Sequence, residues 1–86
     1  MEETKVIKVL LLSSQEIVVS EIEEIAAEFG DPNCKLIKPY KIVGGALHRW
    51  MQDYTEQNEI MINSDKIVTL VTPSPMIFEQ YSKVTS

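Results

Sequence analysis

Two strongly apolar runs separated by a short polar turn lie in the last third of the chain, and they constrain its fold more than any other feature. Residues 60–62 read Ile-Met-Ile, and residues 67–72 read Ile-Val-Thr-Leu-Val-Thr. β-Branched residues are frequent in both runs, which is typical of strands. Asn63, Ser64 and Asp65 separate the runs, and Asn and Asp favour tight turns. We therefore predict a hairpin here.

The second of these runs leaves little polar surface, because residues 67, 68, 70 and 71 are all apolar. Unpaired strand edges of this kind promote association unless something covers them. Two arrangements remain open. The C-terminal segment could cover the hairpin, or residues 59–62 of one copy could pair with residues 66–72 of the next and close a ring. The second arrangement predicts an interface at Ile60, Ile62, Ile67, Val68 and Leu70.

The length and termini of the chain bound its class. With 86 residues we expect a single domain spanning residues 1–86, with a small core. No apolar run approaches the roughly 20 residues of a membrane helix, and Met1-Glu2-Glu3 is acidic where a secretory signal is basic. Cys34 is the only cysteine, which favours a reducing compartment. We expect a cytoplasmic protein that does not bind membranes.

Charge is distributed unevenly along the sequence. The net charge is −5, so the average surface repels nucleic acid. Residues 32–50 are the exception, since they contain no acid. They hold the bases Lys35, Lys38, Lys41 and Arg49.

The remaining segments also favour a mainly β domain. Residues 4–12 and 34–43 are rich in apolar and β-branched side chains and predict strands, with Pro39 marking an edge or a bulge. Residues 46–58, which contain Trp50 and Tyr54, predict an irregular polar connection. Ser74 is a candidate N-cap and Pro75 fits the first position of a short C-terminal helix.

Residues 15–29 support two interpretations. Val18, Ile22, Ile25 and Phe29 recur at helical spacing, and Gly30 is a candidate C-cap. Local propensity therefore favours a helix, which would make the chain a small βαββα adaptor domain. The competing interpretation is a strand over residues 16–24, followed by a turn at residues 30–33.

Catalytic and metal-binding chemistry finds little support. Nucleophilic catalysis needs a nucleophile, a base and an orienting group, and His48 and Cys34 are the only residues of their types. Their spacing matches no metal site. Cys34 fits a small buried apolar side chain, and His48 fits an exposed loop position. We expect no enzyme activity, no metal and no cofactor.

Residues 61–68, Met-Ile-Asn-Ser-Asp-Lys-Ile-Val, resemble the second motif of the Sm-like family, which includes the Hfq-type and LSm proteins. Asn63 stands where that family has Arg, and Ser64 where it has Gly. Residues 9–19 resemble the first motif, two apolar strands around a turn. Residues 36–39, 63–65 and 75–81 are similar to short Sm-like proteins of marine cyanobacterial phages.

This resemblance implies a fold and a function. The fold is a mainly β, Sm-like (SH3-type), five-stranded, strongly bent antiparallel barrel with a short C-terminal helix, and it favours the strand interpretation of residues 16–24. The implied assembly is a homo-oligomeric ring of about five to seven copies that binds single-stranded RNA at its pore. The RNA-binding residues implied are Asn63, Ser64, Asp65, Lys66, Asn33 and Lys35. A ring that binds proteins and no RNA is the alternative.

Overall fold

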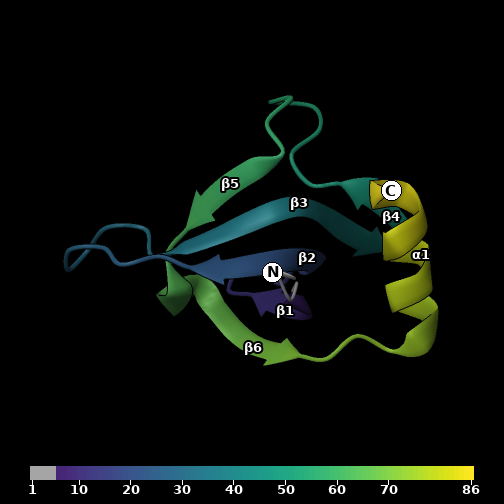
Figure 1. Cartoon of the computed structure of the whole chain (residues 1–86), viewed down its shortest axis with the longest axis horizontal. Coiled ribbons are helices and arrows are strands. Elements are labelled where there is room, and N and C mark those ends of the chain that lie inside the picture. The colour runs from purple at the N-terminus through teal and green to yellow at the C-terminus, as the bar shows by residue number, and fades with distance from the viewer. Residues whose placement is uncertain (1–5) are drawn as a thin grey trace, which may run out of the picture.

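The computed structural model describes residues 6–86 and is mainly β, with one C-terminal helix (Figure 1). The strands are β1 (Ile7–Leu12), β2 (Ile17–Glu24), β3 (Cys34–Val43), β4 (Ala46–Arg49), β5 (Glu59–Ile62) and β6 (Ile67–Val71). A single 3₁₀ turn, Ser64–Lys66, joins β5 to β6, and the helix α1 spans Pro75–Thr85. The beginning of the strand predicted at residues 4–12, and the acidic N-terminus, lie outside the described residues.

All strand pairs are antiparallel, in the order β4-β3-β2-β1-β6, and β5 also pairs with β3. The ten residues of β3 make this possible, because its first half pairs with β5 and its second half with β4. The expected closed barrel is wrong: the sheet is open. Among the described residues β5 pairs only with β3 and β6 only with β1, so the two ends of the sheet are not bonded together.

The hairpin predicted at residues 60–72 is also wrong. β5 and β6 are correctly placed as strands, but the 3₁₀ turn carries the chain from one edge of the sheet to the other (Figure 1). A sixth strand, β4, replaces part of the connection predicted at residues 46–58. It forms a hairpin with β3 through Gly44 and Gly45, whose φ angles of +56° and +80° fit a two-residue turn that favours glycine.

The ambiguous residues 15–29 adopt the strand alternative. β2 pairs with β1 on one side and with β3 on the other, so both rows of its backbone groups are bonded. Val18, Val19 and Ser20 are consecutive and fully buried, which an amphipathic helix does not permit. The helical spacing is accidental, since Phe29, the last member of that stripe, is fully exposed.

The core is small and lies on the inner face of the bent sheet. Its buried members come from β1, β2 and β3, and they are Leu10, Leu12, Val18, Cys34 and Leu36. Half-buried side chains from β2, the segment after β4, β5 and β6 pack against them: Ile22, Trp50, Ile62 and Ile67. Cys34 is therefore the buried apolar side chain that the sequence predicts.

The sheet bends where β3 passes Lys38 and Pro39. Lys38 has a φ of +53°, and the register between β2 and β3 shifts between Val19 and Glu21. The carbonyl of Pro39 accepts a hydrogen bond from the backbone of Trp50 (3.0 Å). The prediction that Pro39 marks a bulge is confirmed.

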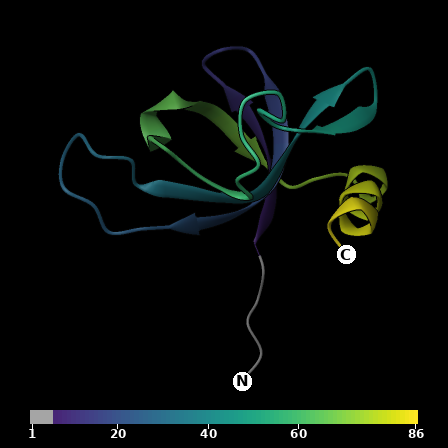
Figure 2. The ribbon, with the colours of Figure 1, turned by 90° about the horizontal axis from the view of Figure 1, so that it is seen from above.

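Helix α1 closes this bent end of the sheet (Figure 2). The predicted cap is confirmed, because Ser74 Oγ accepts a hydrogen bond from the amide of Ile77 (3.3 Å) and Pro75 is the first helical residue. Tyr81 is the buried residue of the helix. No helix within residues 6–86 is long and apolar enough to cross a membrane.

The Tyr81 hydroxyl satisfies the backbone at the bulge. It accepts from the amide of Glu21 (3.0 Å) and lies within donating distance of the carbonyls of Ile37 (3.0 Å) and Lys38 (2.9 Å). Burial raises the pKa of Tyr81, so the phenol stays protonated and can donate. One side chain thus joins α1 to the point where β2 and β3 lose their regular register.

Candidate functional site

The turn between β5 and β6 and the start of β3 meet at the end of the molecule opposite α1. The amide of Ser64 donates to Asn33 Oδ1 (2.9 Å), and the amide of Ser13 donates to the carbonyl of Lys66 (2.8 Å). The fold therefore brings Asn33 beside the segment 63–66, although 30 residues separate them in sequence. Asn63 is half-buried, whereas Ser64, Asp65 and Lys66 are exposed.

Lys35, at the start of β3, is already held in ion pairs. Its ammonium pairs with Glu59 (3.3 Å) and Glu23 (3.8 Å) on the neighbouring strands. The hydrogen bond to Glu59 and the charges of Glu23 and Glu59 raise the pKa of Lys35. A phosphate would have to displace two carboxylates, so Lys66 is the cation best placed to meet an anion here.

The predicted interface residues divide into two groups. Ile60, Ile62 and Ile67 are half-buried, and the last two pack against the core. Val68 and Leu70 on β6 are 63% and 41% exposed. A register shift between Leu11 and Leu12 leaves Val68 without a partner on β1, so it lies in a bulge.

An apolar cavity of about 440 Å³ lies along β6, and we call it the open groove. Ile67 and Leu70 form one side of it, and the other side comes from the end of β2 and the start of β3. Those residues include Ile22, Ile25 and Cys34. Burial, and then the charge of Glu24, raise the pKa of Cys34, which keeps the thiol neutral and unreactive.

Trp50 closes a different side of the molecule. Its Nε1 donates to Glu16 Oε2 (3.3 Å), which also pairs with Lys41 Nζ (3.3 Å). Burial raises the pKa of Glu16. Hydrogen bonds from Ser14, Lys41 and Trp50 and the charge of Lys41 lower it by more, so the pKa of Glu16 lies below its ordinary value. Trp50 thus fastens the segment after β4 to the turn between β1 and β2.

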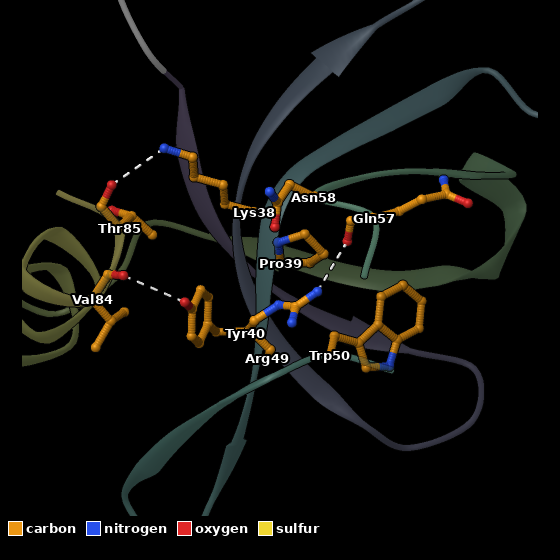
Figure 3. Close-up of a pocket in the computed structure, with 9 residues that line it drawn as sticks. All are labelled: Lys38, Pro39, Tyr40, Arg49, Trp50, Gln57, Asn58, Val84 and Thr85. Carbon is orange, nitrogen blue, oxygen red and sulfur yellow. Dashed lines mark hydrogen bonds between the residues drawn. The ribbon is translucent and has the colours of Figure 1, made fainter. Parts of the chain in front are cut away.

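Three polar side chains that line the cavity beside α1, those of Lys38, Tyr40 and Arg49, already donate hydrogen bonds within the molecule (Figure 3). Lys38 Nζ donates to the carbonyl of Thr85 (3.2 Å) and the Tyr40 hydroxyl to that of Val84 (3.4 Å), so both reach the C-terminal end of α1. Arg49 donates to the carbonyls of Thr55 (3.4 Å) and Gln57 (3.5 Å). This cavity, of about 200 Å³, is a structural joint between α1, β3 and the connection to β5.

His48 lies in β4 and is exposed, although the sequence placed it in a loop. Over residues 6–86, no three His, Cys, Asp or Glu side chains gather in an arrangement suited to a metal ion. Four residues have roles that the sequence did not predict: Tyr81, Glu16, Trp50 and Phe29. Only Phe29 carried a signal, since a large aromatic residue next to a glycine suits an exposed turn.

These features of residues 6–86 define a class, a mainly β domain with an open antiparallel sheet, edge strands β4, β5 and β6, and an apolar groove beside β6. The chain matches a family of unknown function (DUF6561) over residues 5–86, and it belongs to that family. No curated protein sequence matches it.

Proposed function

We propose that this protein is an Sm-like domain that functions as a homo-oligomeric ring, not as an enzyme, within a reducing cytoplasm. The observation that supports this most directly is the position of two of the edge strands, β5 and β6. Within residues 6–86, β5 and β6 each have one strand neighbour, and they lie at different ends of the sheet. Edges placed in this way can pair head to tail, and such pairing closes a ring when the rotation between copies allows it.

The side chains of the edge strands support the same proposal. Val68, Leu70 and Val71 are apolar and partly exposed on β6. Edge strands that remain unpaired in solution usually carry charges or proline to prevent association, and β6 carries neither. Pairing β6 with β5 of another copy would bond its free backbone groups and cover these side chains. The Sm resemblance implies that about five to seven copies close the ring.

Light scattering coupled to size exclusion at micromolar concentration tests the assembly. Wild type should elute as one closed oligomer, and Val68→Asp should be monomeric, because an unpaired charge buried in the interface costs several kcal/mol. Val43→Asp is the matched control, since Val43 is about as exposed but lies at the turn between β3 and β4. A monodisperse wild-type monomer would refute the ring.

Single-stranded RNA at the ring axis is the second candidate function. The hydrogen bond between Ser64 and Asn33 supports it, because it joins two of the segments that the Sm resemblance assigns to RNA. A ring would repeat Lys66 in every copy and raise its effective concentration. Asp65 and the net charge of −5 per chain repel phosphate groups at long range. Binding should therefore be weak and sensitive to salt.

Fluorescence anisotropy with labelled oligo-U and oligo-A, in low and moderate salt, tests this candidate. Lys66→Ala should weaken binding by roughly tenfold, because it removes one phosphate contact per copy. Lys83→Ala is the control, since Lys83 is also an exposed lysine but lies on α1, where it pairs with Glu79 (3.3 Å). If neither RNA binds at tens of micromolar protein in low salt, the ring acts as a protein scaffold without RNA.

A further inference from the structure

The loop between β2 and β3 presents one aromatic side chain to solvent. The amide of Ile25 donates to the carbonyl of Asn33 (3.0 Å), which closes the base of the loop. The amide of Asp31 donates to the carbonyl of Glu28 (3.0 Å), and Gly30 between them has a φ of +92°, as the third residue of a type II turn does. Phe29 occupies the second position of this turn and is fully exposed.

The exposure of Phe29 is unusual, because a phenyl ring left in water gains none of the free energy that burying it would provide. Ala26 and Ala27 are exposed beside it, so the loop offers a small apolar surface. Figures 1 and 2 show the loop projecting away from the sheet, at the end opposite α1. The open groove, at the same end, is apolar and has no side chain of the described residues filling it.

We propose that Phe29 of one copy inserts into the open groove of the next copy in the ring. The inference rests on the proposed pairing between β5 and β6 and adds the contact that fixes it. An exposed apolar side chain on one part of a molecule and a complementary groove on another part form a heterologous contact, which is the kind that builds rings.

The strand directions bring the loop and the groove together. Ile62, at the end of β5, lies opposite Cys34, and the loop ends immediately before Cys34. In an antiparallel pair between copies, the Ile62 end of β5 lies beside the Ile67 end of β6. Ile67 lines the open groove. The copy that supplies β5 therefore carries its own loop to the groove of the copy that supplies β6.

The charge of Lys66 favours the same contact. Phe29 is flanked by Glu28 and Asp31, and the loop contains no basic residue between Ile25 and Asn33. Lys66 lies between Ser64 and Ile67, which both line the groove, and it forms no ion pair within the part of the chain that the structure describes. The acids of an incoming loop would meet Lys66, although Asp65 in the same turn and Glu24 in the lining of the groove oppose this attraction.

Sedimentation velocity over a range of concentrations tests the insertion, with wild type, Phe29→Ala and Tyr54→Ala compared. Phe29→Ala should raise the dissociation constant between copies by about 10- to 100-fold, the loss expected for one buried phenyl ring. Tyr54→Ala is the control, because Tyr54 is also a largely exposed aromatic residue, in a different loop. It should leave the dissociation constant unchanged.

Photo-crosslinking locates the contact independently. Benzoylphenylalanine placed at position 29 should crosslink to a second copy within residues 64–70, as read by mass spectrometry of the crosslinked peptides. A wild-type oligomer that Phe29→Ala leaves intact would overturn the insertion but not the ring. A wild-type monomer would overturn both. If Phe29→Ala lost oligo-U binding while assembly stayed unchanged, Phe29 would be an RNA-binding residue instead, and the insertion would again be overturned.

Discussion

The two ends of this domain differ in how completely their chemical groups are satisfied. At the end that α1 covers, the irregular backbone of β2 and β3 is bonded by Tyr81, and Lys38 and Tyr40 donate to the last carbonyls of α1. At the opposite end, Phe29 is fully exposed, and β6, which pairs with β1 alone among the described strands, has an unpaired edge beside an apolar groove. Both ends belong to one continuous sheet.

This difference separates stability from association. A polar group is expensive to bury without a partner, so the bulge at the α1 end can exist only if something like Tyr81 bonds it. An apolar side chain exposed to water costs less free energy than a buried polar group without a partner, so a folded chain tolerates it until another surface covers it. Substitutions at the α1 end should therefore unfold a single chain, whereas substitutions at the groove end should change assembly.

The largest effect on the single chain should come from Tyr81→Ala. It removes a buried ring and leaves the Glu21 amide unpaired, and we expect the free energy of unfolding to fall by about 3–5 kcal/mol. Urea denaturation followed by circular dichroism measures it. Tyr81→Phe separates the two contributions, since it keeps the ring and should cost about 1–3 kcal/mol. A Tyr81→Ala loss below that of Tyr81→Phe would contradict this account.

Glu16→Gln should have a smaller effect that depends on pH. The folded pKa of Glu16 lies below its ordinary value of 4.5, so its carboxylate stabilises the fold above that pH and loses this effect as the pH falls through the folded pKa. We expect Glu16→Gln to lower the free energy of unfolding by about 1 kcal/mol at pH 7. The gap from wild type should close in acid. A gap that is constant from pH 7 to pH 3 would show that the charge has no part in it.

The smallest effect on the single chain should come from Phe29→Ala. Its side chain is fully exposed in its own copy, so the free energy of unfolding should change by less than about 0.5 kcal/mol. The measurement belongs in the Val68→Asp background, which we expect to be monomeric. A loss of more than about 1 kcal/mol there would mean that Phe29 supports its own fold, and the contrast between the two ends would fail.

The local sequence predicted several elements correctly. The strands at residues 34–43 and 59–62, and the cap of α1 at Ser74 and Pro75, follow from side-chain preferences that act over a few residues. Gly44-Gly45 carried an equally local signal for a hairpin turn, yet β4 was not anticipated, because residues 46–49 lack the apolar alternation of a strand. The Sm-like resemblance remains a prediction.

Residues 15–29 show where local preference fails. Their helical spacing is real in the sequence, but β1 and β3 bond both sides of this segment and bury three consecutive side chains of β2. The same holds for the contact of Asn33 with Ser64, which joins residues far apart in the chain. Asn33 and Ser64 were both candidate residues in the sequence, but whether they lie close together depends on how β3 and β5 pair.

The sequence by itself determined that this chain forms strands, a capped C-terminal helix and a small core that includes Cys34. These follow from the conformational preferences and hydrophobicity of neighbouring residues. Only the tertiary structure decided that β5 and β6 pair at different ends of an open sheet, that Tyr81 bonds the bulge, and that Phe29 is left in water. Strand pairing joins distant segments, and its free energy depends on every other pair in the sheet, so no single stretch of sequence encodes it.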